Sequence, residues 1–81
     1  MALAGTRSRQ AIRAAEESLT PREIEVLHGI AGGWSNRRVA DALSIGEGTV
    51  KTHLKRVYGK LYARNRTQAV AIGRSKGLLR G

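Results

Sequence analysis

Hydrophobic residues in the second half of the chain recur at the spacing of an α-helix. Val50, Leu54, Val57 and Leu61 are three or four positions apart. At 100° per residue, the other three side chains fall within about 40° of Val50. The pattern predicts a helix over residues 47–61 with one buried stripe. The opposite side carries small, polar and basic residues, which we call the basic ridge: Gly48, Lys51, Thr52, Lys55, Arg56 and Gly59.

A capping signature predicts the start of an earlier helix. Thr20 and Glu23 form a capping box, and Pro21 occupies the first helical position. Hydrophobic residues follow at helical spacing and are expected in the core: Ile24, Leu27 and Ala31, with Val26 and Ile30 widening the face. The two glycines at residues 32–33 end this helix.

A second, shorter helix is expected over residues 36–43. Ser35 is a favourable N-cap, and Trp34 precedes it in a position to pack onto Val39. The helical pattern places Val39, Ala40 and Leu43 on the inward face. It places Arg37, Arg38 and Asp41 on the outward face. Residues 44–46 then form a three-residue turn that leads into the long helix.

The end of the chain predicts one more helix. The polar residues 64–66 read as a loop, and Thr67 is expected to cap a helix that ends near Lys76. Its apolar edge consists of Ala69, Val70 and Ile72. Gly77 is a natural helix stop, after which residues 78–79 can fold back.

These elements predict a single all-α domain over residues 19–79. The preceding residues 1–18 are expected to form a flexible N-terminal segment. Two alternatives stay open for residues 8–17, which are rich in helix formers but poor in apolar side chains. They form either an extra short helix packed weakly on the domain or a solvated linker to something upstream.

The composition favours a polyanionic partner. Fifteen Lys and Arg against six Asp and Glu give a formal charge of +9. This excess predicts nucleic acid first and an anionic membrane surface second. The membrane alternative is weaker, because no window approaches the roughly 18–20 apolar residues of a spanning helix. The first residues lack the apolar core of an export signal, so a cytoplasmic location is expected.

No pattern in the chain indicates an enzyme, a metal site or a cofactor. The two histidines and six acidic residues lack the paired spacing of an acid and a base. Cysteine is absent, which excludes a thiolate metal site. His53 is expected to be packed or hydrogen-bonded, with a phosphate contact as the alternative. Trp34 is expected in the core. Glu47 is expected to be a carboxylate that stabilises the start of the long helix, with a hydrogen bond from a cytosine amino group as the alternative.

Two helices joined by a three-residue turn, the second with a basic outer face, make a helix-turn-helix motif over about residues 36–55. In this geometry the first helix lies across the DNA backbone, so that Asn36, Arg37 and Arg38 near its start can reach phosphates. The second helix presents the first half of the basic ridge to base edges, while Arg56 contacts phosphate. The alternative for the ridge is an ordinary solvated helix face.

Several short segments of the sequence match the motifs of a known family, in their residues and in their spacing. They are Leu-Thr-Pro-Arg-Glu-Ile-Glu-Val-Leu at 19–27, Gly-Trp-Ser-Asn at 33–36, Thr-Val-Lys-Thr-His at 49–53 and Asn-Arg-Thr-Gln-Ala at 65–69. In these blocks the chain resembles the LuxR-type (NarL/FixJ) DNA-binding effector domain of transcriptional regulators. The resemblance implies a four-helix domain whose third helix reads the major groove and whose fourth forms a dimer contact.

Carried over position by position, the resemblance assigns base contacts to Lys51, Thr52 and Lys55. It places Asn36 and Thr49 near the DNA backbone, and it assigns the dimer contact to the helix that carries Ala69, Val70 and Ile72. The chain departs from the family pattern at three positions, Gly46, Gly48 and Tyr62.

We therefore expect sequence-specific binding to double-stranded DNA by a bacterial transcriptional regulator, as a homodimer on an inverted repeat, with RNA polymerase as a further partner. Two other classes of protein stay open. One is a non-catalytic protein-interaction domain of the transcription machinery, which would tolerate changes at Thr52 and Lys55. The other is a sigma-factor-like promoter-recognition module.

Overall fold

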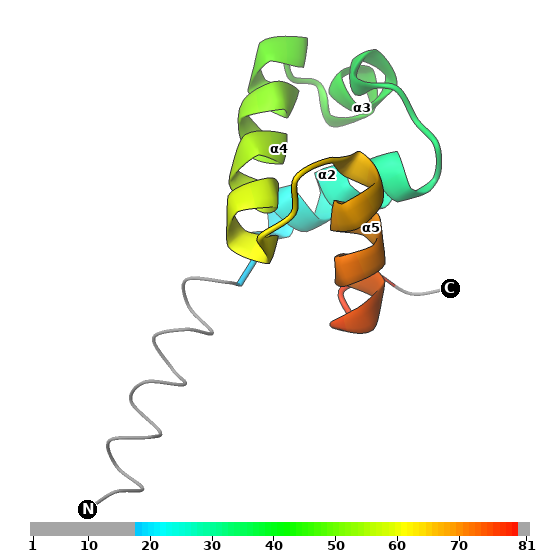
Figure 1. Ribbon diagram of the computed structural model, residues 1–81. Coiled ribbons are helices and arrows are strands. Elements are labelled where there is room, and N and C mark those ends of the chain that lie inside the picture. Colours follow the sequence, from blue (N-terminus) through cyan, green and yellow to red (C-terminus); the bar gives the residue numbers. More distant parts are fainter. Residues whose placement is uncertain (1–17, 80–81) are drawn as a thin grey trace, which may run out of the picture.

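The computed structural model describes residues 18–79 and shows an all-α fold (Figure 1). Within these residues there are four helices and no strand: α2 (Pro21–Ala31), α3 (Asn36–Leu43), α4 (Glu47–Leu61) and α5 (Arg66–Ser75). The predicted fold class is confirmed. The expectations for the N-terminal segment and its extra helix fall on residues 1–17, which lie outside the described residues.

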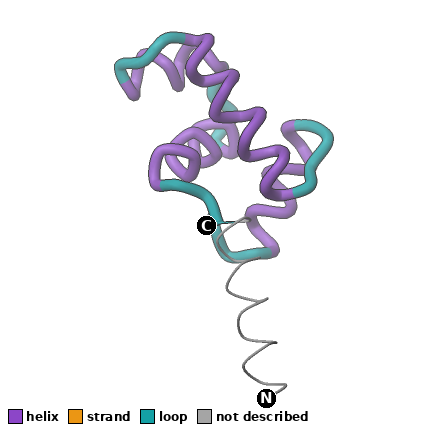
Figure 2. Tube along the Cα trace, turned by 90° about the vertical axis from the view of Figure 1, so that its left-hand side faces the viewer, coloured by secondary structure: helices purple, strands orange, loops and turns teal. Residues whose placement is uncertain are grey.

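Helix α4 packs against each of the other three described helices. In Figure 1 it stands along one side, with α3 beside its first turns, α5 beside its last turns and α2 crossing behind. The tube in Figure 2 shows the same part of the chain as helices joined by loops. Because α2, α3 and α5 all pack on it, one face of α4 is covered along its whole length. None of the described helices is long and apolar enough to cross a membrane.

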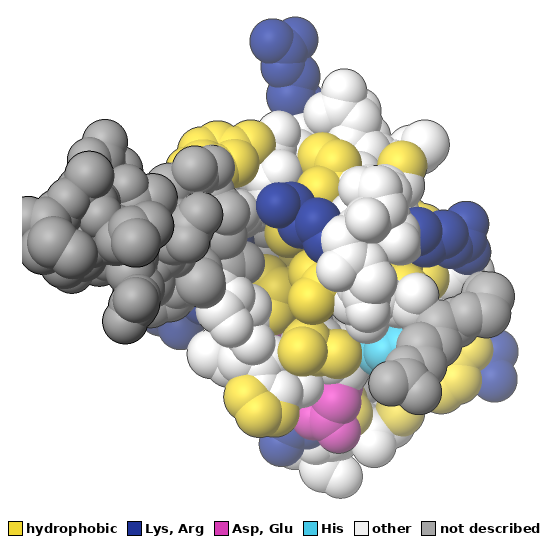
Figure 3. Space-filling model, turned by 90° about the horizontal axis from the view of Figure 1, so that it is seen from below, with side chains coloured by type: hydrophobic (Ala, Val, Ile, Leu, Met, Phe, Trp, Pro, Cys, Tyr) yellow, Lys and Arg dark blue, Asp and Glu magenta, His cyan; other side chains and the backbone are white. Residues whose placement is uncertain are grey.

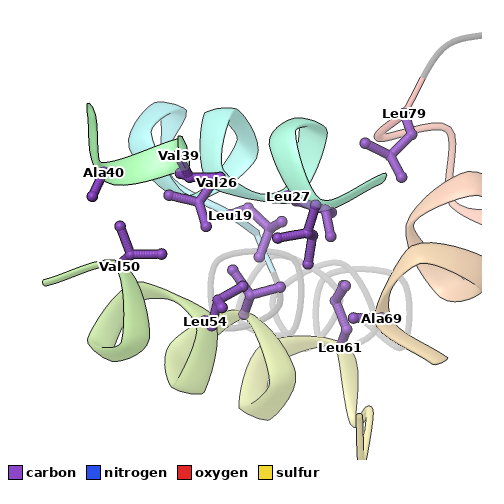
Figure 4. Close-up of a cluster of buried hydrophobic side chains, with 12 residues drawn as sticks. Leu19, Val26, Leu27, Val39, Ala40, Val50, Leu54, Leu61, Ala69 and Leu79 are labelled. Carbon is purple, nitrogen blue, oxygen red and sulfur yellow. The ribbon is translucent and has the colours of Figure 1, made fainter. Parts of the chain in front are cut away.

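The core is built from leucine, valine, isoleucine and alanine side chains of all four helices and the segments that flank them. Its buried members are Leu19, Val26, Leu27, Ile30, Val39, Ala40, Val50, Leu54, Val57, Leu61, Ala69 and Leu79. The stripe predicted on α4 is buried at all four positions. In Figure 4, Val50 faces Val39 and Ala40, while Leu61 faces Ala69 at the other end of the helix.

The capping predictions hold for the first two of these helices. Thr20 Oγ1 accepts from the Glu23 backbone N–H at 3.1 Å, and Glu23 Oε1 accepts from the Thr20 N–H at 2.9 Å. Ser35 Oγ accepts from the Arg38 N–H at 3.1 Å. Gly46 caps α4 without a side-chain hydrogen bond. The starts of α2 and α3 are thus fixed by local chemistry.

The predicted cap of the last helix is wrong. Asn65, and not Thr67, is the N-cap of α5, and its Oδ1 accepts from the Gln68 N–H at 2.9 Å. Both side chains are suitable caps and they stand two positions apart, so local preference alone does not choose between them. Because Asn65 is chosen, Arg66 becomes the first residue of the helix.

The buried face of α2 is rotated from the predicted one. Val26, Leu27 and Ile30 are buried as expected, whereas Ile24 and Ala31 are only half-buried. Their place is taken by Glu23, which is 2% exposed. A carboxylate at a core position needs partners, and the sequence pattern indicates only one of them, the capping box with Thr20.

Two close approaches between helices depend on glycine. A Cβ at Gly29 of α2 would lie 2.8 Å from Val39 Cγ2, and one at Gly73 of α5 would lie 3.0 Å from Leu27 Cδ2. Neither role was predicted. After α5, Gly77 has φ +76° and the Leu78 N–H donates to the Gly73 carbonyl at 2.8 Å. Leu79 is buried as the expected fold-back requires.

Candidate nucleic-acid interface

The basic ridge lies on the side of α4 that faces away from the bundle. Every member of the ridge is exposed, and every member of the opposite stripe is buried. The side chains of Lys51 and Lys55 make no ion pair or hydrogen bond with any other described residue. Their charges are therefore available to a polyanion.

Thr52 makes a hydrogen bond within its own helix. Its Oγ1 donates to the Gly48 carbonyl at 3.1 Å. The hydroxyl proton is thereby used, while the oxygen lone pairs and the methyl group stay exposed. In this rotamer Thr52 can accept a hydrogen bond or make an apolar contact, but it cannot donate.

The glycines at the start and on the ridge of α4 have no packing role in the free protein. A Cβ added at Gly46, Gly48 or Gly59 would meet no atom within 4 Å. This contrasts with Gly29 of α2 and Gly73 of α5, where a Cβ would come within 2.8 and 3.0 Å of a neighbouring side chain. Interior helical glycines cost about 0.5–1 kcal/mol relative to alanine. At Gly48 and Gly59 the domain thus carries this cost without an internal benefit.

The start of α3 is joined to the start of α5 by Arg66, which was predicted to lie in a loop. Arg66 Nη2 donates to Asn36 Oδ1 at 2.7 Å, and Arg66 Nη1 donates to the Trp34 carbonyl at 3.4 Å. Arg38 stacks over the Trp34 ring, with 4.3 Å between its Cζ and the ring centroid. Arg37 beside it is exposed, as is Thr49 on α4. The predicted backbone-contacting residues thus lie on two adjacent helices.

A partly buried ion pair joins α4 to α2. Lys60 Nζ donates to Glu23 Oε1 at 2.7 Å. Burial alone would raise the pKa of the Glu23 carboxyl, but hydrogen bonds from Lys60 and Thr20 and the Lys60 charge outweigh it and hold that pKa below its ordinary value. The ion pair between Lys60 and Glu23 was not predicted from the sequence. It fastens the last turns of the helix that carries the basic ridge.

His53 is half-buried, and its Nδ1 is buried without a hydrogen-bond partner among the described residues. His53 was expected to be either packed or hydrogen-bonded, and the environment of Nδ1 supports the packed role. Trp34 is half-buried against the core, in keeping with its expected role. Across residues 18–79, no three His, Cys, Asp or Glu side chains come together in a way that could hold a metal ion.

The candidate dimer residues do not share one environment. Ala69 is 0% exposed, so it belongs to the core of its own protomer and has no surface for a second one. Val70 and Ile72 are half-buried at the margin of the core. Val70 also lines a shallow hollow between α2 and α5, together with Ile30, Ala31, Arg66, Thr67, Ala71 and Arg74. The apolar edge of α5 is therefore narrower than the sequence predicts.

Exposed cations occur on all four described helices, among them Arg22, Arg37, Lys51 and Arg74. The face seen in Figure 3 shows a band of hydrophobic side chains with Lys and Arg mostly around it. Net charge alone therefore does not define a binding surface. The feature that distinguishes α4 is the combination of unpaired lysines, a small polar side chain and glycines on one exposed line.

Comparison with known proteins agrees with this geometry. The family model for bacterial regulatory proteins of the luxR family matches residues 17–72. The probable transcriptional regulatory protein SgaR of Hyphomicrobium methylovorum is 50% identical over 56 residues, which are 69% of this chain and 26% of SgaR. The nitrate/nitrite response regulator NarP of Escherichia coli is 44% identical over 54 residues, 67% of this chain and 25% of NarP.

Among solved structures, the response regulator ChrA of a heme-sensing two-component system superimposes with a TM-score of 0.74 and 47% identity, covering 76% of this chain and 31% of ChrA. The chain spans only about a quarter to a third of these proteins. Because the family model matches more than half of its residues, the chain belongs to the LuxR family of bacterial regulatory proteins, as a helix-turn-helix DNA-binding domain of a transcriptional regulator.

Proposed function

We propose that this domain reads double-stranded DNA by inserting the first two turns of α4 into the major groove. The observation that carries the proposal is the basic ridge, which is exposed along its length while the other face of the same helix is core. A B-form major groove admits one α-helix, and the ridge offers it short side chains between cations. Because the helix is packed on three others, it can enter the groove as a rigid unit.

In this proposal, residues of the basic ridge contact base edges, and residues at the start of α3 and on α4 contact phosphates. Base contacts come from Lys51, Thr52 and Lys55. With its proton used inside the helix, Thr52 accepts from a cytosine or adenine amino group, or packs its methyl group on a thymine. Backbone contacts come from Asn36, Arg37, Thr49 and Arg56. Phosphate contacts position the helix and supply the salt-dependent part of the affinity.

A homodimer on an inverted repeat is the second part of the proposal. The exposed side of α5, with Val70 and Ile72 beside the shallow hollow at the end of α2, is the surface offered to a second copy. Ala69 takes no part because it is buried. Contact with RNA polymerase, and a cytoplasmic location with the DNA, follow from the family role in transcription.

A footprint on genomic DNA fragments, repeated over a series of salt concentrations, tests both parts. We expect two protected half-sites related by two-fold symmetry. We also expect log K to fall linearly with log salt, with a slope of about −3 to −4 per domain, because four cations of this surface, Arg37, Lys51, Lys55 and Arg56, neutralise DNA charge. A single asymmetric half-site would contradict the dimer. A flat salt dependence would contradict DNA as the partner and favour a protein-interaction domain.

Replacing Gly48 by alanine is expected to change stability and DNA affinity in opposite directions. The free protein should gain about 0.5–1 kcal/mol of unfolding free energy, since alanine is the better helix former and the new methyl group meets nothing. In the complex, the same methyl group lies between α4 and the groove and should cost about 1 kcal/mol or more. Thermal unfolding and fluorescence anisotropy measure the two effects.

The matched control is Gly59→Ala. Gly59 lies on the same line of α4, eleven residues further along the chain and beyond the turns that enter the groove. Its replacement should stabilise the free protein equally and leave the affinity unchanged. If Gly48→Ala raised both stability and affinity, the close approach of α4 to the DNA would be ruled out.

A further inference from the structure

Arg66 spans two helices that share no backbone packing. Among the described helices, α3 and α5 are the one pair whose Cα atoms nowhere come within 8 Å of each other. The Arg66 side chain leaves the first position of α5 and reaches the first position of α3, where Nη2 donates to Asn36 Oδ1 at 2.7 Å. Its Nη1 reaches the Trp34 carbonyl at 3.4 Å. Two contacts from one planar guanidinium fix where the Asn36 side chain lies.

The chemistry of this contact also decides which way the Asn36 amide faces. A guanidinium only donates hydrogen bonds, so the amide must turn its oxygen toward Arg66. The NH2 group then occupies the other branch of the amide, and it has no hydrogen-bond partner among the described residues. A phosphate oxygen only accepts, so an asparagine that contacts phosphate must present this NH2 group and not its oxygen. Arg66 therefore selects the amide orientation that a phosphate contact requires.

We propose that Arg66 is a positioning residue for DNA binding: it holds the Asn36 amide so that its NH2 group donates to a backbone phosphate at the start of α3. This inference rests on the proposed function. Arg66 acts through Asn36 and does not itself touch the DNA. The role is specific to arginine because one fork engages both Asn36 and the Trp34 carbonyl.

The test is a double-mutant cycle on DNA affinity, with the duplex found by the footprint and the whole chain as protein. Asn36→Ala and Arg66→Ala should each weaken binding about tenfold, the effect of losing one hydrogen bond to a charged group. The double variant should also lose about tenfold, because the two residues make a single contact. A hundredfold loss in the double variant would overturn the inference.

The salt dependence separates positioning from direct charge. Because Arg66 does not touch phosphate, Arg66→Ala should leave the slope of log K against log salt unchanged. A slope smaller by about 0.9 would mean that Arg66 itself contacts a phosphate, which overturns the inference. Arg64→Ala is the matched control, since it removes the same charge two residues earlier from an exposed side chain that makes no contact with α3. If Arg64→Ala and Arg66→Ala lost equal DNA affinity, the loss would come from net charge alone, and the inference would be overturned.

A second variant keeps the test valid if Arg66→Ala unfolds. Asn36→Asp keeps the acceptor that Arg66 binds but replaces the NH2 donor by an oxygen. The free protein should remain folded, while affinity should fall more than tenfold. Unchanged affinity in this variant would overturn the inference and leave the proposed function intact. Failure of the wild-type chain to bind DNA at any salt concentration would instead overturn the proposed function.

Discussion

Replacing Lys60 by methionine should destabilise the domain more than any other change on the surface of α4. The variant leaves the Glu23 carboxylate, which is 2% exposed, without its counter-ion. Breaking a fully buried pair costs about 3–5 kcal/mol, and about 2–3 kcal/mol is expected here because 26% of the Lys60 side chain is exposed. For a domain of this size that corresponds to a decrease of about 10–20 °C in Tm. Thermal unfolding measured by circular dichroism checks this value.

The destabilisation should depend on pH in a definite direction. The pKa of Glu23 is lowered in the folded protein, so the contribution of the pair is complete above the ordinary value of 4.5 and is lost as the pH falls through the folded pKa. The wild-type protein should thus lose stability in acid, and the difference from Lys60→Met should shrink toward pH 3. A difference that stayed constant from pH 7 to pH 3 would assign the loss to packing alone.

Glu23→Gln provides the control for this ion pair. Glutamine can still close the capping box with Thr20, and Lys60 can move its ammonium group into water, so the cost should be only about 1 kcal/mol. Combining Glu23→Gln with Lys60→Met should recover most of the loss caused by Lys60→Met alone, because no buried charge remains. An additive loss in the double variant would contradict a coupled pair.

Features determined by neighbouring residues could be predicted from the sequence. The capping box at Thr20, the bounds of α3 and α4 and the buried stripe on α4 depend on residues within about one or two helical turns. The same local signals failed where two of them competed, as at Asn65 and Thr67. They also placed Ala69 at an edge that proved to be core, since the orientation of α5 is set by its packing on α2 and α4.

Contacts between distant residues could not be predicted in this way. Glu23 and Lys60 are 37 positions apart, and Asn36 and Arg66 are 30 apart. Neither pair has a periodicity that links its members. A signal for Glu23 was present, because it stands three residues before Val26 and four before Leu27, on the buried side of α2. An acidic residue on such a stripe predicts a buried partner without identifying it.

The largest expected effect on DNA binding is that of removing Lys51 and Lys55 together. Both are exposed, unpaired among the described residues and on one side of α4, so alanine at both positions should leave the fold and Tm nearly unchanged. If each side chain loses a contact of about 1–3 kcal/mol, affinity for the footprinted site should fall by about 100-fold or more. The slope of log K against log salt should become smaller by about 1.8, or 0.9 for each cation. Fluorescence anisotropy over a range of salt concentrations measures both quantities.

The matched control removes two positive charges elsewhere, by Arg22→Ala and Arg74→Ala. Arg22 on α2 makes only an exposed pair with Glu25 at 3.6 Å, and Arg74 is exposed on α5. This variant has the same net charge as the lysine variant but an intact basic ridge, so its affinity should fall only a few-fold, through the weaker field of the whole domain. If the control lost as much affinity as the lysine variant, binding would follow net charge, and α4 would not be the surface that reads the DNA.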